Sequence, residues 1–351
     1  MHLLPLNDYH QRHAMAFGAV ADTRVPLYYR SAEDEVRAAE QGPVVMDRSF
    51  LGLVRVSGKD GGDLLQRLTT NDLRHLQAGQ GIVNLFTNAK GRIVDAVEIL
   101  RREDEYWLIA SPGHATTDAK WIAQYTFIEE VQTLEISDRF CVLSVFGKIP
   151  AGFAGLPTER LAPQTFCSVS VAGAEGCLHH TNGIAPEGFN LIVPRDAGEK
   201  VWEHLLRFAP AIGYAAYNTL RVHAGIPAID AEISEQYNPH EVNLLPFVSF
   251  EKGCYIGQEV VARLDSYDKV QRRLVGLEFE REDVPPPPRP IWAGEQQIGV
   301  LTSSALLPSR RRIVGLGIVR RADAAAGGRV RVREQERVYD GVIVALPFTS
   351  P

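Results

Sequence analysis

The sequence has few cysteines and no long apolar run, and both absences limit what the protein can be. Its 351 residues include four widely spaced cysteines and no CxxC pair. A disulfide framework or a structural zinc site is therefore not expected, and we predict a reducing, cytoplasmic compartment. No stretch of about 18 uninterrupted apolar residues occurs, so we expect no membrane span and no membrane partner. The N-terminus lacks the charged and apolar regions of a signal peptide.

Several catalytic signatures are also missing. The chain has no GxSxG, no HExxH, no Walker A loop, and no GxGxxG between a strand and a helix. These absences argue against a serine hydrolase, a zinc protease and a nucleotide-phosphate site. His179-His180, and His223 with His240-Glu241, lack the spacing of metal ligands, so we expect these histidines to be solvated or hydrogen-bonded. We therefore predict no permanent metal.

The charge is acidic overall but uneven along the chain. The net charge is −6, which argues against a nucleic-acid surface over the whole molecule. From residue 267 to the end, however, 14 Lys and Arg stand against 10 Asp and Glu. The excess comes from arginine clusters at Arg310-Arg311-Arg312, Arg320-Arg321 and Arg329/Arg331/Arg333. Solvated strand faces and turns are the favoured interpretation, and a patch that binds a polyanion such as tRNA is the alternative.

Helices and strands alternate between Leu53 and Phe146, a pattern that favours an α+β sandwich with antiparallel pairing. The clearest unit is a hairpin with a strand at Gly81–Thr87, a turn at Asn88–Gly91 and a returning strand at Arg92–Leu100. Asp95 shares the apolar face of the returning strand, so it needs a partner or a chemical role. A hydrogen bond to turn backbone is the favoured interpretation over a functional carboxylate.

The pattern changes after Tyr267 to short strands separated by Gly and Pro turns, which indicates a small antiparallel barrel. The proline run at residues 285–288 is interpreted as a stiff loop inside that barrel domain. We therefore divide the chain into residues 1–266 and a C-terminal β-barrel at 267–351. The first region is expected to hold two α+β subdomains, with the second, at about 47–140, inserted in the first.

The segment from Glu251 to Arg263 carries the most distinctive chemistry. Cys254 lies two residues after Lys252 and between two glycines, and a nearby cation or helix N-terminus lowers the pKa of a thiol. The preceding run, Leu244–Phe250, has the composition of a strand, and a helix is expected to begin at Gln258-Glu259. Residue chemistry alone leaves two interpretations equally open: a functional thiol, or a small buried cysteine in a tight turn.

The octapeptide KGCYIGQE, Lys252 to Glu259, resembles the signature of the YgfZ-type folate-binding proteins, as do Asn238–Leu244 before it and Val260–Arg263 after it. The resemblance extends over nearly the whole chain, because that family shares its architecture with the aminomethyltransferase (T-protein) of the glycine cleavage system. Its other landmarks are Val25–Tyr29, Val45–Ser49, Thr70–Leu73, Gly188-Phe189 and Thr219–Pro227. It implies an α+β cloverleaf of three domains around a tetrahydrofolate channel, the third domain being an antiparallel β-barrel.

The chain departs from the aminomethyltransferases at four positions of their channel. Where those enzymes have paired aspartates, this chain has Asp95-Ala96, and Ala96 takes the place of their catalytic acid. Their tyrosine in the outgoing strand falls at Val83, their glutamate after Gly-Phe at Asn190, and an arginine at Tyr217. Because a methyl group cannot replace an acid that engages the folate amine, aminomethyl transfer in the manner of those enzymes is not expected.

From this resemblance we expect a cytoplasmic YgfZ-like accessory protein for iron–sulfur cluster assembly or repair. Its partners would be iron–sulfur client proteins or assembly factors. Cys254 would act by thiol exchange, transient cluster ligation or nucleophilic attack, and tetrahydrofolate would occupy the channel. The residues expected at the thiol site are Cys254 and Lys252, with Gly253, Tyr255, Gly257, Gln258, Glu259 and Arg263; those expected at the folate are Asp95, Asn190, Tyr217 and Arg221.

Two alternatives remain open at this point. One is a folate-dependent one-carbon transferase or demethylase, acting on aminomethyl or methyl groups, with Asp95 as the acid. The other is an accessory protein of tRNA modification that would use the barrel arginines.

Overall fold

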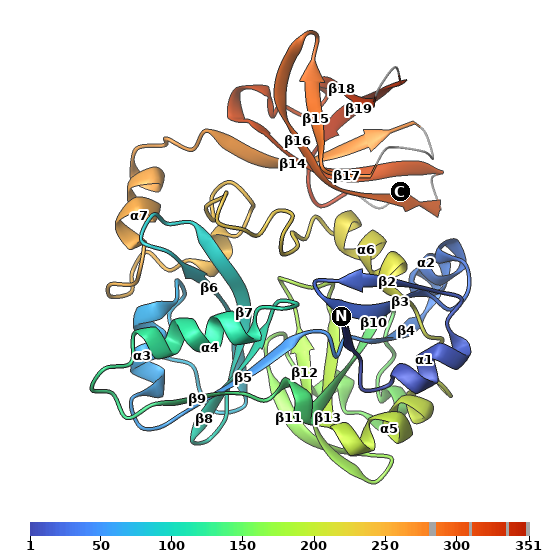
Figure 1. The fold of residues 1–351 in the computed structure, drawn as a ribbon, viewed down its shortest axis with the longest axis vertical. Helices are drawn as coiled ribbons and strands as arrows, with labels where there is room; N and C mark the ends of the chain where they lie inside the picture. The colour runs from blue at the N-terminus through green and yellow to red at the C-terminus, as the bar shows by residue number, and fades with distance from the viewer. Residues whose placement is uncertain (281–285, 309–310, 335–336, 349–351) are drawn as a thin grey trace.

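The computed structural model describes residues 1–280, 286–308, 311–334 and 337–348. Three lobes meet around the centre of the molecule in Figure 1: an N-terminal lobe at the lower right, a middle lobe at the left and a barrel at the top. The predicted α+β cloverleaf with an antiparallel C-terminal barrel is confirmed.

The N-terminal lobe is built on a five-stranded antiparallel sheet with the order β11-β12-β13-β10-β4, beside a small sheet with the order β1-β3-β2. Helices α2 and α6 pack against each other, and α6 also packs on β3. The elements are β1 (His2–Leu3), α1 (Asn7–His13), β2 (Ala16–Val20), β3 (Thr23–Tyr28), α2 (Ala32–Gln41), β4 (Pro43–Asp47), β10 (Phe140–Gly147), β11 (Phe166–Val171), β12 (Ala174–Thr181), β13 (Gly188–Pro194), α5 (Gly198–Leu205) and α6 (Tyr214–His223).

The middle lobe lies in sequence between β4 and β10, two strands that pair with each other in the N-terminal sheet. It has its own antiparallel sheet, β6-β7-β8-β5-β9, with α3 and α4 beside it (Figure 1). The leucines of α3 are buried because they repeat on one helical face. The elements are β5 (Gly52–Ser57), α3 (Gly61–Leu68), β6 (Gln80–Thr87), β7 (Ile93–Arg101), β8 (Glu105–Ala110), α4 (Ala115–Gln124) and β9 (Gln132–Glu135). The predicted hairpin is the β6–β7 pair.

The C-terminal lobe is a closed barrel of six antiparallel strands in the order β14-β17-β16-β15-β18-β19. Alternate residues of these strands fill its core. The strands are β14 (Arg272–Phe279), β15 (Arg289–Ala293), β16 (Gln296–Leu307), β17 (Arg312–Arg320), β18 (Arg329–Glu334) and β19 (Arg337–Val344). Strand β15 was not predicted, because it follows the proline run and contains Pro290. Pro285, the first residue of that run, lies outside the described residues, and the other three prolines precede β15 without forming a helix or strand.

The segment between α6 and the barrel corrects one prediction and confirms another. Residues 244–250 are not a strand but a single 3-10 turn, η5 (Leu245–Phe247), within a loop. Pro246 has no N–H for a sheet ladder, and the neighbouring residues find other backbone acceptors, with Ser249 N donating to Thr70 O at 3.0 Å. Helix α7 (Gln258–Ser266) begins where predicted. Among the described residues, no helix is long and apolar enough to span a bilayer.

Candidate functional site

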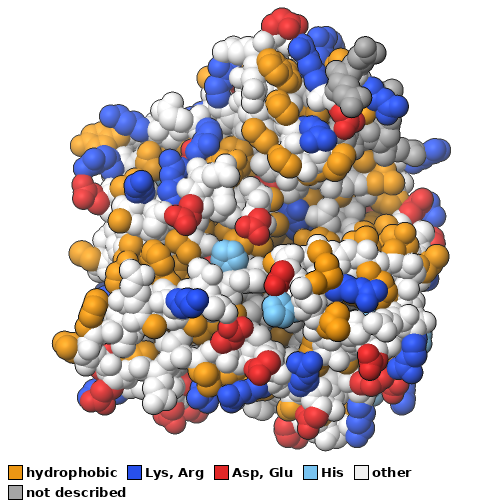
Figure 2. Space-filling view, in the orientation of Figure 1, with side chains coloured by type: hydrophobic (Ala, Val, Ile, Leu, Met, Phe, Trp, Pro, Cys, Tyr) orange, Lys and Arg blue, Asp and Glu red, His pale blue; other side chains and the backbone are white. Residues whose placement is uncertain are grey.

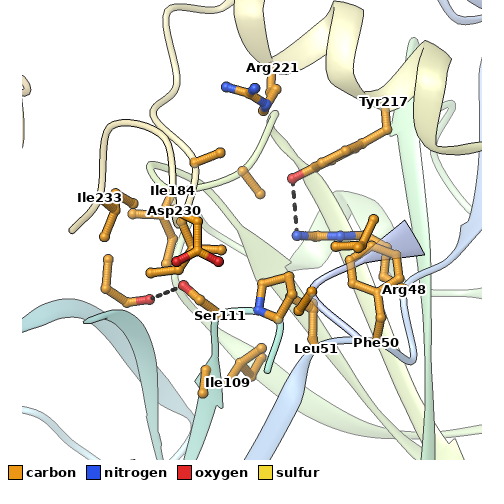
Figure 3. Close-up of a pocket in the computed structure, with 18 of the residues that line it drawn as sticks. Arg48, Phe50, Leu51, Ile109, Ser111, Ile184, Tyr217, Arg221, Asp230 and Ile233 are labelled. Carbon is orange, nitrogen blue, oxygen red and sulfur yellow. Dashed lines mark hydrogen bonds between the residues drawn. The ribbon is translucent and has the colours of Figure 1, made fainter. Parts of the chain in front are cut away.

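A cavity of about 230 Å³ lies where the N-terminal lobe, the middle lobe and the loop after α6 meet. Its walls are mostly apolar, as is typical of small-molecule sites. Residues after β4, on β7 and at the end of β8 form one side, and α6 with the loop at 227–233 forms the other. Figure 3 shows Arg48, Ser111, Tyr217, Arg221 and Asp230 around it.

Arg48 is one of two buried arginines that line the cavity, the other being Arg221. Arg48 is 5% exposed, and its Nη2 donates to the hydroxyl of Tyr217 at 3.1 Å, the bond drawn in Figure 3. The guanidinium also lies 4.8 Å from the centre of the Tyr217 ring. Among the described residues Arg48 makes no ion pair, and its buried Nε has no hydrogen-bond partner. A buried guanidinium without an anion favours a ligand that brings an acceptor.

Three of the four predicted folate residues do line the cavity: Asn190, Tyr217 and Arg221. Asn190 Oδ1 accepts from Ser144 Oγ at 2.7 Å, whereas its buried Nδ2 has no partner. Asn190 therefore contributes a second unused donor to the cavity. Arg221 is more fully engaged, because its Nη2 donates to Ser303 Oγ at 2.8 Å and its Nη1 lies 3.6 Å from Glu232 Oε2.

Asp95, the fourth predicted folate residue, does not line the cavity. Neighbouring side chains on a strand point to opposite faces, so Asp95 and Ala96 face opposite sides of β7. Ala96 lines the cavity, whereas Asp95 is fully buried on the other face, where its Oδ2 accepts from the backbone N–H of Ser111 at 3.1 Å. This agrees with the interpretation of Asp95 as a carboxylate that hydrogen-bonds to loop backbone. It removes Asp95 as the acid of a folate reaction.

Glu98 is the buried acid among the residues that line the cavity, whereas Asp230, which also lines it, is exposed. Glu98 lies two residues after Ala96 on β7 and shares its face. The carboxylate is buried; its Oε1 accepts from the hydroxyl of Thr181, and its Oε2 lies 3.4 Å from Nδ1 of His179. Burial lowers the pKa of His179, although the charge of Glu98 opposes that shift. At neutral pH we therefore expect a neutral imidazole beside the Glu98 carboxyl.

The ammonium of Lys252 is engaged by backbone carbonyls of the middle lobe. It is buried against that lobe and donates to three backbone carbonyls at the end of α3, namely Gln66 O at 2.6 Å, Thr69 O at 2.6 Å and Asn71 O at 2.7 Å. A lysine at the C-terminal end of a helix satisfies its last carbonyls. These contacts are those of an anchor between two segments far apart in the sequence, and a catalytic role of Lys252 beside Cys254 stays a prediction.

Other residues of the motif also hold the segment on the β6–β7 hairpin. Tyr255 is buried, and the carbonyl of Ile256 accepts from Thr87 Oγ1 at 2.5 Å. Gly257 has φ 85°, and a Cβ there would lie 2.5 Å from Asn88 O, so only glycine fits. Gln258 opens α7, where Glu259 and Arg263 form an exposed ion pair four residues apart. Packing against the hairpin thus accounts for Tyr255, Ile256 and Gly257.

Cys254 is the exception within the motif. Its side chain is exposed, whereas Cys141 and Cys177 are buried and Cys167 is half-buried. Burial raises the pKa of the Cys141 and Cys177 thiols to about 12 in each case, so these two stay unreactive. The alternative of a small cysteine buried in a tight turn is therefore wrong. Cys254 is a surface thiol on an anchored loop, and it does not belong to the lining of the cavity.

The arginines of the barrel do not form a free basic patch. Figure 2 shows Lys and Arg side chains on the barrel interspersed with acidic and apolar ones. Six described arginines lie within ion-pair distance of acids: Arg289 with Glu334, Arg312 with Glu278 and Glu280, Arg320 with Asp323, Arg321 with Asp268, Arg331 with Asp340, and Arg333 with Glu295. Arg310 lies outside the described residues. The interpretation as solvated, paired charges is favoured.

Sequence reasoning missed Arg48, Glu98 and Asp230, three charged residues that line the cavity. Arg48 belonged to a landmark of the family resemblance, but nothing in its spacing showed that it would be buried without an anion. Glu98 did give a signal, because it is a second acid within the apolar run of β7, at the spacing that puts it on the same face as Ala96.

Comparison with known proteins gives a consistent picture over the whole chain. Residues 6–252 match the GCVT N-terminal domain, and residues 272–349 match the glycine cleavage T-protein C-terminal barrel domain. The chain is 27% identical to an aminomethyltransferase of Caldanaerobacter subterraneus subsp. tengcongensis, covering 98% of this chain and 95% of that protein. It is 29% identical to an aminomethyltransferase of Chlorobium chlorochromatii, covering 93% and 92%. The fold resembles that of the glycine cleavage system aminomethyltransferase T from Bartonella henselae, with a TM-score of 0.90, 24% identity and coverage of 99% and 98%.

Proposed function

This chain belongs to the glycine cleavage T-protein family, and from that membership we propose that its central cavity binds a reduced folate of the tetrahydrofolate class. The observation that carries the proposal is the set of unsatisfied donors in an apolar cavity. Arg48 Nε and Asn190 Nδ2 are buried without partners, and Glu98 adds a carboxylate acceptor. A pterin ring has apolar faces and both donors and acceptors at its edge, so this residue set fits it.

We propose one-carbon transfer, on aminomethyl or methyl groups, as the activity of this site. Tetrahydrofolate, when bound, would supply the nitrogens that take up the one-carbon unit, and the amino group of an aminomethyl donor would leave as ammonia. Ala96 stands where the resemblance to the aminomethyltransferases places their catalytic acid. Glu98 offers a carboxyl to the cavity from the same face of β7. Glu98 would exchange a proton with the amine of the substrate or of the folate, and Thr181 would hold its carboxyl in place. The apolar walls would exclude water from the reacting atoms.

Binding of tetrahydrofolate to the purified chain tests the proposal directly. We expect saturable binding by calorimetry under anaerobic conditions, and we expect Arg48→Met to weaken it about 10- to 100-fold, since a hydrogen bond to a charged group contributes about 1.5–3 kcal/mol. Arg37→Met, an exposed change on α2, is the matched control. Absence of binding to the wild type, or equal affinity in a folded Arg48→Met variant, would refute the folate site.

A second candidate function is the YgfZ-like role in iron–sulfur cluster assembly or repair, and the exposure of Cys254 favours it. Packing accounts for Lys252, Tyr255 and Gly257, whereas Cys254 projects from the anchored loop without a structural task. A Cβ at Gly253 would also meet no atom within 4 Å, so the chain beside the thiol is open. An accessible thiol on a fixed loop suits exchange or transient ligation with a partner protein.

Complementation distinguishes this role from a folate reaction in the cavity. In a strain that lacks the native protein, Cys254→Ser is expected to reduce the activity of cluster-dependent enzymes at least tenfold relative to the wild type. Cys167→Ser, which alters a half-buried thiol, should restore it. If Cys254→Ser complemented as well as the wild type, the thiol would have no such role, and the folate proposal would stand unaffected.

The tRNA-modification alternative stays a prediction with weaker support. The barrel arginines that would carry it are largely paired with acids, whereas binding to phosphates needs Lys or Arg side chains that are free to displace the counterions of the nucleic acid.

A further inference from the structure

A buried cluster on the far face of β7 has no place in the folate proposal. Asp95 lies on β7, and His114 and Asp118 lie at the start of α4. Each residue offers one potential ligand atom, and the three atoms lie within 4.8 Å of one another. His114 precedes the first residue of α4, and Asp118 lies four positions later, so both point from the same side of the helix. The two carboxylates are completely buried.

Four polar atoms of this cluster lack a hydrogen-bond partner among the described residues. Asp95 Oδ1, both carboxylate oxygens of Asp118 and Nδ1 of His114 are buried without a hydrogen bond to any of them. Two buried carboxylates side by side cannot both ionise without a positive charge between them.

We propose that Asp95, His114 and Asp118 bind one divalent transition-metal cation of the zinc or manganese class. One imidazole nitrogen and two carboxylates form a mixed set that such ions accept, whereas calcium and magnesium prefer oxygen ligands alone. Ligands at about 2.0–2.2 Å from zinc lie roughly 3–4 Å from one another, so the cluster needs only a small contraction. His114 is partly exposed, which gives the ion a route from solvent.

The cation would act on the wall of the folate cavity without entering it. Asp95 Oδ2 accepts from Ser111 N, and the side chain of Ser111 lines the cavity and contacts Ala96 O at 3.4 Å. Fixing Asp95 to α4 would hold the loop between β8 and α4 in place. The site is thus a positioning element, and its existence does not depend on which reaction the cavity supports.

Metal uptake by the full-length, untagged chain tests the site. After removal of metal with a chelator, we expect one Zn²⁺ per chain by elemental analysis and a rise in Tm of roughly 5 °C at a hundredfold excess over Kd. Co²⁺ in place of Zn²⁺ should give visible d–d absorption. His114→Asn and Asp118→Asn should each weaken binding at least tenfold and remove the absorption. His75→Asn, which alters an exposed histidine, should change nothing.

Three results would overturn the proposal. The first is wild-type protein that takes up no stoichiometric Zn²⁺ or Mn²⁺. The second is equal uptake by the wild type, His114→Asn and Asp118→Asn. The third is a metal-free Asp118→Asn variant whose Tm exceeds that of the metal-free wild type and is not raised further by Zn²⁺. That result would mean that the carboxyls of Asp95 and Asp118 share a proton instead of a metal ion. If a variant failed to fold, stoichiometric uptake and the Co²⁺ spectrum of the wild type would decide.

Discussion

Methionine in place of Lys252 is expected to lower the free energy of unfolding by about 3 kcal/mol and Tm by roughly 5–10 °C. The change removes three charge-assisted hydrogen bonds, to Gln66 O, Thr69 O and Asn71 O, and keeps most of the apolar length of the side chain. The carbonyls at the end of α3 would then lack their buried donor. Urea and thermal unfolding of the two proteins measure the difference.

The pH dependence gives a second readout of the same contact. Burial lowers the pKa of Lys252 from 10.5 to about 8, so at pH 7 the side chain is mainly the ammonium that donates all three bonds. Between about pH 8 and pH 10.5, Lys252 is still protonated in the unfolded chain but has lost its proton in the folded chain. Lys252 therefore makes the free energy of unfolding rise with pH across that window, and Lys252→Met should remove this rise.

The matched control is Lys120→Met, which alters an exposed lysine of α4 and should stay within about 0.5 kcal/mol of the wild type. If Lys252→Met unfolded at the same urea concentration as Lys120→Met, the three carbonyl bonds would contribute nothing, and Lys252 would again be available for a role beside Cys254.

The sequence predicted the architecture well because that architecture follows from local patterns. The β6–β7 hairpin has a polar four-residue turn between two apolar strands, and α7 begins after a glycine whose φ of 85° ends the preceding loop. The error at residues 244–250 has a physical reason too. An apolar composition does not distinguish a strand from a buried loop, and Pro246 had already removed a donor that a strand needs.

The candidate site could be predicted only in part, because its chemistry depends on contacts between distant segments. Nothing near Lys252 in the sequence indicates that its three acceptors lie more than 180 positions earlier. The alternation of β7, by contrast, was readable, since Ala96 and Glu98 must share a face while Asp95 takes the other. Assigning the acid to Asp95 followed the resemblance to a paired motif rather than this alternation, and the structure corrects it.

Glutamine in place of Glu98 is expected to reduce folate-dependent one-carbon transfer about 10²- to 10⁴-fold, the usual contribution of a general acid or base. Glutamine keeps the size of the side chain and an oxygen that can accept from Thr181, so the fold and the cavity should persist. It cannot exchange a proton. The measurement is the rate of formation of methylene-tetrahydrofolate from tetrahydrofolate and an aminomethyl donor, whose carbon is already at the oxidation level of the product, together with the affinity for tetrahydrofolate.

The role of Glu98 is decided by whether Glu98→Gln changes mainly kcat or mainly the affinity for tetrahydrofolate. An acid that acts during transfer should lower kcat while tetrahydrofolate binding changes less than about tenfold, because the carboxyl is needed most in the transition state. Glu259→Gln, an exposed change on α7, should leave both quantities at wild-type values. If Glu98→Gln lost affinity and kept kcat, Glu98 would recognise the pterin edge rather than carry a proton. A wild type that binds folate but forms no product with any donor would leave the cavity as a binding site and shift the activity to Cys254.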